Sequence, residues 1–311
     1  MSGALRVAIV GYGKIAEDQH VPAIAGREDM ALVATVSRRA AAPEGVPAFT
    51  SIAELRASGI GVDAVALCMP PSDRPATAFE AIDAGWHVLM EKPPAATLGA
   101  VAAIERTAAA AGVTLFATWH SRFAPAVGRA KALLAGQDIR ALEIDWREDV
   151  RKWHPGQAWI WQPGGFGVFD PGINGLSVAT EILPVELVVA AAALELPANR
   201  DQPIAAELRF AGPGVPEGAR ASFDWRETDG ERWTVRVATA RDTLLLTDGG
   251  AKLAVNGAAV AADGPGEYPA LYHRFAELVA AGRSEVDVRP LRLVADAFLI
   301  GETRRGAAFD D

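Results

Sequence analysis

Short apolar runs alternate with helical patterns through the first third of the chain. The apolar runs are as long as buried strands and span 5–10, 31–36, 62–68, 86–90 and 113–117. Helical patterns cover 73–84 and 97–111, and the glycines that follow them, Gly85 and Gly112, are typical of helix C-termini. Strands that alternate with helices of this length predict an α/β fold with a doubly wound parallel sheet.

Beyond about residue 120 the pattern changes to short alternating strands with turn residues between them. These strands are predicted at 204–210, 219–225, 231–238 and 242–246. Helical patterns follow at 268–281 and 291–301, and the second is expected to pack back on the first part of the chain. A chain of 311 residues is long for one domain, so we predict two.

A glycine-rich turn, Gly11-Tyr12-Gly13-Lys14-Ile15-Ala16, directly follows the first predicted strand. In the pattern G-x-G-x-x-A the first glycine permits a tight turn, the second lets the backbone approach a pyrophosphate, and the small last residue allows close helix–strand packing. The helix that follows points free N–H groups at the phosphates. An ordinary glycine turn is the alternative, but the position after the first strand indicates a dinucleotide site at Gly11, Gly13, Lys14 and Ile15.

The residues after the second predicted strand bear on which dinucleotide is bound. NAD sites often have Asp or Glu there to hold the ribose hydroxyls, whereas this chain has Ser37, Arg38 and Arg39. A hydroxyl and a guanidinium suit a 2′-phosphate, because arginine offers paired donors and stacks on adenine. A solvated basic pair is the alternative. We predict cofactor binding through Ser37 and Arg38, with NADP preferred and NAD tolerated.

Composition excludes several classes of function. The net charge is −9, with 30 Lys and Arg against 39 Asp and Glu, and nucleic-acid binding requires clustered positive charge. Cys68 is the only cysteine, so no internal disulfide forms, and no ligand-spaced motif predicts a metal. No apolar run approaches the ~18 residues of a membrane span, and no signal-peptide pattern is seen. We expect a cytoplasmic protein that binds neither nucleic acid, membrane nor metal.

The tetrapeptide Glu91-Lys92-Pro93-Pro94 follows the strand predicted at 86–90. Ligands of open parallel sheets bind beyond the carboxyl ends of the strands, and Pro93 ends the strand with an extended backbone at Lys92. An ammonium there can hold a substrate hydroxyl and favour its alkoxide, or relay its proton. Without further context, a surface lysine before a Pro-Pro turn fits equally well.

The segment 147–174 concentrates polar side chains among tryptophans. The polar residues are Glu148, His154, Asp170 and Asn174, and five of the eight tryptophans lie between 119 and 161. Flat aromatic rings bind the apolar face of a sugar while polar groups read its hydroxyls. Core packing is an equal alternative for each tryptophan.

Asp170 and Asn174 are four residues apart and are expected to project from one face of a helix. Pro171 at the first helical position would make Asp170 an N-cap, so cap and ligand are competing roles. His120 follows the strand at 113–117 and is expected to reach the same crevice. Trp153, His154 and Trp233 are further substrate candidates, with a purely structural role as the alternative for His154.

Three motifs occur in an order and at separations that resemble one enzyme family. They are Val10–Ala16, Glu91–Pro93 and Gly164–Asn174, and they resemble the glucose–fructose oxidoreductase/myo-inositol dehydrogenase (Gfo/Idh/MocA) family. Longer tracts at 116–122, 148–157 and 287–292 are similar to the bacterial aldose 1-dehydrogenases that act on L-arabinose and D-galactose. The resemblance extends over essentially the whole chain.

The resemblance implies an NAD(P)-binding Rossmann domain at 1–121 and a substrate-binding α+β domain at 122–311. The second domain would carry a large, mostly antiparallel sheet through which two copies can form a homodimer. The implied reaction is oxidation at C1 of an aldose, L-arabinose, D-galactose or D-fucose, to the aldonolactone, with NAD(P)⁺ as hydride acceptor. Glu91 belongs to the implied cofactor site as well as Lys92.

The resemblance also implies that Lys92, Asp170 and Asn174 surround the reacting carbon. Our working hypothesis is that His120, Glu148 and Trp153 read the remaining sugar. Many family members have histidine where this chain has Asn174. Asparagine cannot exchange a proton near neutral pH, so the general base stays open.

Two other functions stay open. A non-catalytic sensor of NAD(P) or sugar could use the same fold, although a sensor needs no proton-handling pair such as Lys92 and Asp170. A family dehydrogenase that acts on a cyclitol or a dihydrodiol is compatible with the same motifs.

Overall fold

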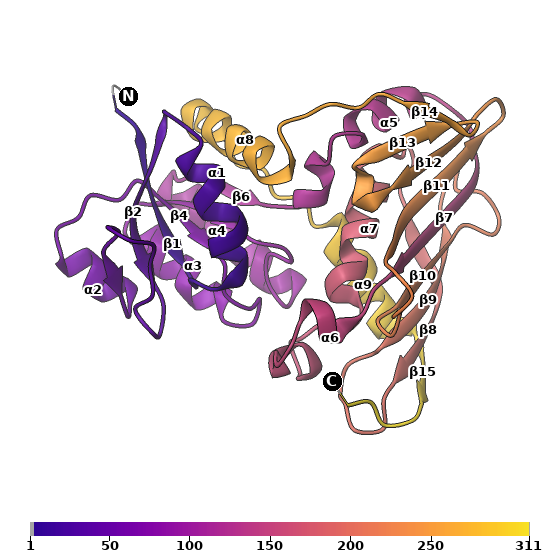
Figure 1. Ribbon diagram of the computed structural model, residues 1–311, viewed down its shortest axis with the longest axis horizontal. Coiled ribbons are helices and arrows are strands. Elements are labelled where there is room, and N and C mark those ends of the chain that lie inside the picture. Colours follow the sequence, from indigo (N-terminus) through magenta and orange to yellow (C-terminus); the bar gives the residue numbers. More distant parts are fainter. Residues whose placement is uncertain (1–2, 311) are drawn as a thin grey trace. The chain divides into compact units, whose positions relative to one another are not determined.

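The computed structural model describes residues 3–310, which form two compact units (Figure 1). The first unit contains the chain as far as Trp119 together with Tyr268–Asp287. The second contains His120–Glu267 and the chain from Val288 onward. Each unit is built around one β-sheet, and each is described below by itself.

The sheet of the first unit has six strands in the order β3-β2-β1-β4-β5-β6, and every pairing is parallel. The strands are β1 (Leu5–Val10), β2 (Met30–Val36), β3 (Ala48–Phe49), β4 (Ala64–Leu67), β5 (His87–Met90) and β6 (Leu115–Ala117). This is the strand order of a Rossmann fold, which binds ligands where the order reverses between β1 and β4. The predicted doubly wound parallel sheet is confirmed.

Short helices connect these strands. They are η1 (Ala16–His20), α1 (Val21–Ala25), α2 (Ile52–Ala57), α3 (Arg74–Asp83) and α4 (Leu98–Ala111). At the start of α4 the Thr97 side chain accepts the N–H of Ala100, and at its end Gly112 has φ +68°, so a capping side chain and a left-handed glycine set its length.

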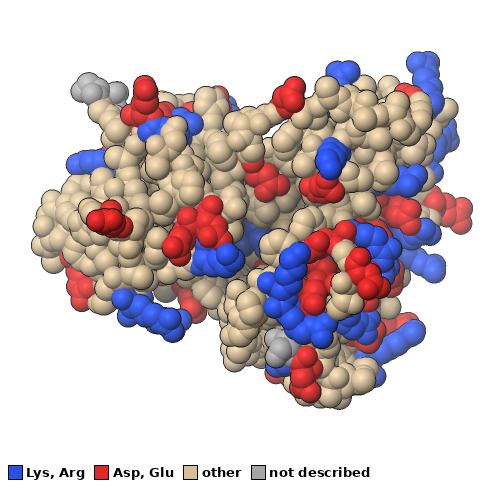
Figure 2. Space-filling model, viewed as in Figure 1, with Lys and Arg blue, Asp and Glu red and all other residues tan. Residues whose placement is uncertain are grey.

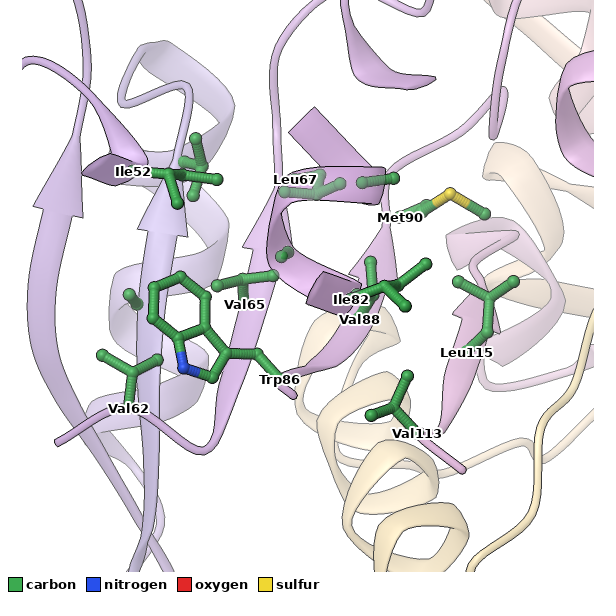
Figure 3. Packing of buried hydrophobic residues seen from close by; sticks show 14 of the residues in the cluster. Ile52, Val62, Val65, Leu67, Ile82, Trp86, Val88, Met90, Val113 and Leu115 are labelled. Carbon is green, nitrogen blue, oxygen red and sulfur yellow. The ribbon is translucent and has the colours of Figure 1, made fainter. Parts of the chain in front are cut away.

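The core of this unit explains why β4 and β5 consist of continuous apolar residues. Both strands are covered on both faces, as is usual in a parallel sheet. Figure 3 shows Ile82 of α3 and the neighbouring Trp86 packed among Val65 and Val88. This packing holds the carboxyl ends of β4 and β5, where folds of this kind bind their ligands.

The segment that returns to the first unit is Tyr268–Asp287, most of it helix α8 (Glu267–Ala281). Phe275 of α8 stacks on Phe116 with ring centroids 6.3 Å apart. After the helix, the Glu285 N–H donates to the Leu115 carbonyl at 2.9 Å, which extends the edge of β6.

The sequence led us to expect that the helix near 291–301 packs back on the first unit. That helix, α9 (Arg289–Ile300), belongs to the second unit and packs against β8 and α7, with Phe298 edge-to-face on Phe169 at 5.3 Å. Both α8 and α9 carry an apolar stripe, and such a stripe requires a partner without specifying which one.

The sheet of the second unit has nine strands in the order β14-β13-β12-β11-β7-β10-β9-β8-β15. Their bounds are β7 (Ile139–Arg147), β8 (Val188–Leu196), β9 (Ala205–Ala211), β10 (Arg220–Asp224), β11 (Arg232–Thr239), β12 (Thr243–Thr247), β13 (Lys252–Val255), β14 (Ala258–Val260) and β15 (Glu302–Arg305). Only β7–β10 and β8–β15 pair in parallel, so the predicted mostly antiparallel sheet is confirmed.

One face of this sheet is covered by α7 (Phe169–Ile182) and α9, which lie side by side (Figure 1). The remaining helices are η2 (His120–Phe123), α5 (Val127–Leu134), α6 (Val150–Trp153), η3 (Ala158–Trp161) and η4 (Asp248–Gly250). Helix α7 approaches the sheet closely, because a Cβ on Gly175 would lie 2.8 Å from both Ile144 Cγ2 and Trp146 Cε3. Glycine at this position lets α7 seat firmly, and α7 carries Asp170 and Asn174.

Charges of both signs are interleaved on the surface, as the face shown in Figure 2 illustrates. Many of them form ion pairs, such as Arg226 with both Asp224 and Glu195. Among residues 3–310, no helix combines the length and apolar character needed to cross a membrane.

Candidate active site

The glycine-rich turn lies at the carboxyl end of β1, next to the end of β4. Gly11 has φ +89°, and a Cβ there would lie 2.5 Å from the Met69 backbone nitrogen, so no other residue fits without moving the backbone. Nothing lies within 4 Å of a Cβ built on Gly13, which leaves that side of the turn open. The turn needs glycine at position 11, and the space beside Gly13 is open. This combination fits a turn whose backbone binds the pyrophosphate of a dinucleotide.

The other predicted cofactor residues lie near this turn or at the end of β2. Lys14 is exposed and pairs with Asp18 one helical turn away, and Ile15 is an exposed apolar side chain. Ser37 follows β2, where its hydroxyl accepts the Ala41 N–H at 3.1 Å, and Arg38 beside it is exposed.

Glu91, predicted to bind cofactor, has its carboxylate inside the first unit. Its Oε1 accepts the Tyr268 hydroxyl at 2.7 Å and lies 3.1 Å from His20 Nε2, while Oε2 accepts the Lys92 backbone N–H at 2.8 Å. Because a carboxylate oxygen only accepts, His20 Nε2 carries a hydrogen. The other ring nitrogen of His20 lies 2.8 Å from the Tyr272 hydroxyl. Glu91 is thus one member of a buried polar cluster.

Burial and charge act in opposite directions within this cluster. Burial disfavours the imidazolium of His20, but its hydrogen bonds and contacts with Cys68, Tyr272 and the Glu91 carboxylate favour it more and hold the pKa of His20 well above its ordinary value. Burial raises the pKa of Tyr272 to about 12, so its hydroxyl stays protonated at neutral pH. The His20 ring is fully buried, and both of its nitrogens lie within hydrogen-bond distance of a partner.

Lys92 is half-buried at the carboxyl end of β5, and its bond to Pro93 is cis. Arg74, the first residue of α3, is 2% exposed and donates to three backbone carbonyls, those of Glu91, Pro93 and Met69. The residues before and after Lys92 are therefore bound by the same guanidinium.

In the second unit, Glu148 is held by two indole groups. It follows β7, is buried, and accepts the Trp225 Nε1–H at 3.1 Å and the Trp233 Nε1–H at 3.0 Å. Trp225 is fully buried, whereas Trp153 of α6 is 40% exposed and packs on Trp233 at 5.6 Å. A buried carboxylate beside an accessible aromatic ring is the combination that a sugar site requires.

The remaining tryptophans divide between core and surface roles. Trp119, Trp146 and Trp161 are buried, so the core-packing alternative holds for them. Trp146 also stacks on Trp233 at 6.3 Å, which links the core to the Glu148 cluster.

Asp170 is buried in the first turn of α7, one turn before the half-buried Asn174. The helix begins at Phe169 with Val168 as its N-cap, so Asp170 is not the cap and Pro171 is not its first residue, in contrast to the expectation. The turn Phe166–Asp170 carries the chain into the helix earlier, with the Asp170 N–H donating to the Gly167 carbonyl at 2.8 Å.

His154 brings two of these clusters together. Its Nε2 lies 3.4 Å from Asp170 Oδ2, its ring is edge-to-face with Trp225 at 5.2 Å, and Nδ1 lies 3.3 Å from Gln157 Oε1. Through Trp225 the imidazole connects Asp170 to Glu148. The structure therefore gathers Glu148, Trp153, His154, Asp170 and Trp233 into one connected group.

His120 begins η2, which follows β6 and packs against α7. Its Nδ1 is 2.7 Å from Glu267 Oε2, so this histidine has a carboxylate partner of its own. Within the described residues, no three His, Cys, Asp or Glu side chains are arranged to hold a metal ion.

Sequence reasoning missed Trp225, Arg74 and Glu267. Trp225 could have been found from the strand at 219–225, where alternate residues face the side that α7 covers. Arg74 and Glu267 carry no local signal, because a charged residue at a helix start is ordinarily exposed.

Comparison with known proteins places this geometry in a family. Residues 5–118 match the Gfo/Idh/MocA model, an oxidoreductase family with an NAD-binding Rossmann fold. Galactose 1-dehydrogenase from Pseudomonas fluorescens is 46% identical over 308 residues, which are 99% of both chains.

Solved structures agree. D-galactose-1-dehydrogenase protein from Rhizobium etli is 49% identical, with a TM-score of 0.94 over 100% of this chain and 99% of that one. A 3-ketoreductase from Actinomadura kijaniata, solved with NADP, is 18% identical with a TM-score of 0.83 over 98% of this chain and 100% of its own, which shows the shared fold. The resemblance seen in the motifs is confirmed, and this chain belongs to the Gfo/Idh/MocA family of oxidoreductases.

Proposed function

We propose that this oxidoreductase oxidises C1 of a cyclic aldose to the aldonolactone, with D-galactose as a substrate. The observation that carries the proposal is 46% identity to a galactose 1-dehydrogenase along 99% of both chains. L-Arabinose and D-fucose share the ring stereochemistry of D-galactose and differ at C5, so they belong to the same proposal.

The reaction removes a proton from the C1 hydroxyl and a hydride from C1, and leaves a C1 carbonyl as the lactone. We assign the proton to Lys92 and Asp170. An ammonium beside the hydroxyl favours the alkoxide, and a carboxylate accepts the proton that the hydroxyl gives up. The two groups belong to different units, and their pairing rests on this chemistry.

The contact between His154 and Asp170 supports the assignment of Asp170. Asn174 cannot take up a proton, but an imidazole 3.4 Å from the Asp170 carboxylate can share the one that Asp170 accepts. Although position 174 is asparagine, the chain therefore has an imidazole next to the acid. Asn174 would orient the hydroxyl through its amide.

Glu148, Trp153 and Trp233 are proposed to bind the rest of the sugar, together with His120. The two indole N–H donors orient the Glu148 carboxylate, so it can accept sugar hydroxyls without rearranging. The exposed ring of Trp153 offers a flat surface for the C–H face of the sugar.

The residues around the β1 turn fit a nicotinamide dinucleotide, with Gly11, Gly13, Lys14, Ile15 and Ser37 as its proposed contacts. When bound, the oxidised dinucleotide supplies the acceptor for the hydride that C1 loses. We propose that Glu91 contributes to this site by holding the strand end rather than by touching the cofactor.

NADP is the proposed preferred cofactor, with NAD tolerated, because Arg38 is exposed at the end of β2. Arg38→Ala should raise the KM for NADP by about tenfold or more, the loss expected of a charged hydrogen bond, with little effect on the KM for NAD. Initial rates with each cofactor measure both values. Arg56→Ala removes another exposed arginine and serves as the control. Equal effects of Arg38→Ala on both cofactors would contradict the assignment.

The proposed activity is tested by the absorbance of reduced nicotinamide, with NADP or NAD and a panel of aldoses, cyclitols and dihydrodiols. D-Galactose, L-arabinose or D-fucose should drive reduction most efficiently, as judged by kcat/KM. If only a cyclitol or a dihydrodiol drove reduction of the cofactor, that compound class would replace aldoses as the proposed substrate. Cofactor binding with no reduction by any compound would favour a non-catalytic sensor.

A homodimer through the nine-stranded sheet and a cytoplasmic location are also part of the proposal. The sheet face away from α7 carries polar side chains, including Arg147, Ser222 and Glu207, which bond to one another in a row. A hydrogen-bonded polar face of this kind is compatible with pairing to a second copy.

A further inference from the structure

The peptide backbone around Lys92 is held by a buried arginine from one side. Arg74 starts α3, directly after the turn that ends β4, and its guanidinium reaches across to the end of β5. One nitrogen, Nη1, donates to the carbonyls of both Glu91 and Pro93, and Nη2 donates to the carbonyl of Met69. The flanking carbonyls of Lys92 and the end of the neighbouring strand are thereby fixed to one rigid, planar group.

The Glu91 side chain holds the same backbone from the other side. Its Oε2 accepts the Lys92 N–H at 2.8 Å, and its Oε1 is fixed by the Tyr268 hydroxyl and by His20 Nε2. Tyr268 comes from α8 and His20 from the helix after the glycine-rich turn. The N–H of Lys92 and the carbonyls on both sides of it thus all end on buried side chains of the first unit.

Burial of the Arg74 guanidinium costs free energy that its hydrogen bonds to the backbone must offset. Arginine is almost never fully buried, and a hydrophobic residue of similar size is often as stabilising as a buried ionic group. Backbone carbonyls at a strand end can be satisfied by water, so stability alone does not require a guanidinium here. What the guanidinium adds is a fixed orientation of the peptide that carries the Lys92 side chain.

We propose that Arg74, together with Glu91 as held by His20 and Tyr268, positions the ammonium of Lys92 for proton transfer from the C1 hydroxyl. These are positioning residues, because they act through Lys92. The inference rests on the proposed function, in which Lys92 handles that proton. Misplacement of a reacting group by about 1 Å can cost on the order of 10²-fold in rate, so a loosened strand end affects turnover more than binding.

A double-mutant cycle of Arg74→Lys with Lys92→Ala tests this proposal. The lysine in Arg74→Lys keeps the positive charge but lacks the planar fork that spans three carbonyls. We expect Arg74→Lys to lower kcat by about 10- to 100-fold, with the KM for D-galactose little changed. In the Lys92→Ala background the same substitution should change kcat by less than about twofold, since the group it positions is gone.

A control variant, a second test variant and a stability measurement separate the outcomes. Arg56→Lys changes an exposed arginine that bonds Asp83 and should leave kcat unchanged. Tyr268→Phe removes the hydroxyl that donates to the Glu91 carboxylate, and it is combined with Lys92→Ala in a second double-mutant cycle. The proposal is then tested even if Arg74→Lys does not fold. Thermal unfolding of each variant is measured beside its kinetics.

The proposal would be overturned if Arg74→Lys and Tyr268→Phe each lowered kcat by the same factor in the Lys92→Ala variant as in the unchanged protein. The two residues would then act on the fold as a whole rather than through Lys92. Unchanged kcat in both single variants would overturn it as well. If Lys92→Ala alone keeps its turnover, the role of Lys92 in the proposed function is what fails, and this is seen without any change at Arg74.

Discussion

Lys92→Ala should lower kcat by about 10²–10⁴-fold, the range that a positioned proton-transfer group contributes. The ammonium is expected to stabilise the alkoxide that forms when the C1 hydroxyl loses its proton, a charge that is absent from the bound sugar. Because the interaction develops in the transition state, kcat should fall much more than KM rises. Steady-state rates over a range of D-galactose concentrations, at saturating NADP, measure the two separately.

The matched control is Lys252→Ala, which removes a lysine that is 75% exposed and pairs with Asp248. Solvent screens an exposed pair of this kind, so its loss should change stability little and leave kcat as it was. Lys92→Arg separates the effect of the charge from that of the geometry, because arginine keeps the positive charge in a group of different shape. Turnover of Lys92→Ala within a few-fold of the unchanged protein would remove Lys92 from the mechanism.

Asp170→Asn should lower kcat by about 10²–10⁴-fold as well, because an amide of the same shape cannot accept the hydroxyl proton. The structural cost should be small by comparison. Asp170 lies in the first turn of α7, where a negative charge in a buried setting favours the helix by up to about 2 kcal/mol, and it does not cap the helix. A large loss of kcat with a modest change in the free energy of unfolding, measured by urea denaturation, would support the catalytic role.

His154 provides the second test of this assignment. If it shares the proton that Asp170 accepts, His154→Gln should lower kcat less than Asp170→Asn does and should alter the pH dependence of kcat. In the Asp170→Asn background it should have little further effect, because the pair acts as one unit. Asp248→Asn, at an exposed carboxylate, is the control. An Asp170→Asn variant that retains full turnover would leave the proton with another group.

Much of the fold could be predicted from local chemistry. The turn at Gly11 needs a positive φ and a close backbone approach, and the end of α4 needs a left-handed residue, which are demands that only glycine meets easily. The apolar runs of β1, β4 and β5 are legible because both faces of a parallel strand are buried. The position of Lys92 at a strand end follows from the same pattern. Both the glycine-rich turn and this lysine could therefore be predicted from the sequence.

The second unit was harder to predict. Strand β7 lies in the centre of its sheet but outside the predicted strands, although Leu142, Ile144 and Trp146 alternate with polar residues as in a strand with one buried face. Its pairing partners in β10 and β11 are about 75 to 100 residues away along the chain. Strand order depends on pairings across such distances, and these leave little trace in a local window.

What the sequence by itself determined was the class of the main elements of the first unit, the dinucleotide turn, and which residue types could do the chemistry. Only the tertiary structure decided their partners: Glu91 turns inward to His20 and Tyr268, Glu148 lies between Trp225 and Trp233, Asp170 meets His154, and α8 rather than α9 returns to the first unit. The physical reason is the range of the interactions. Backbone conformation and hydrophobic period are properties of neighbouring residues, whereas a buried hydrogen bond or a packed helix face is satisfied by whichever distant group the fold brings to it.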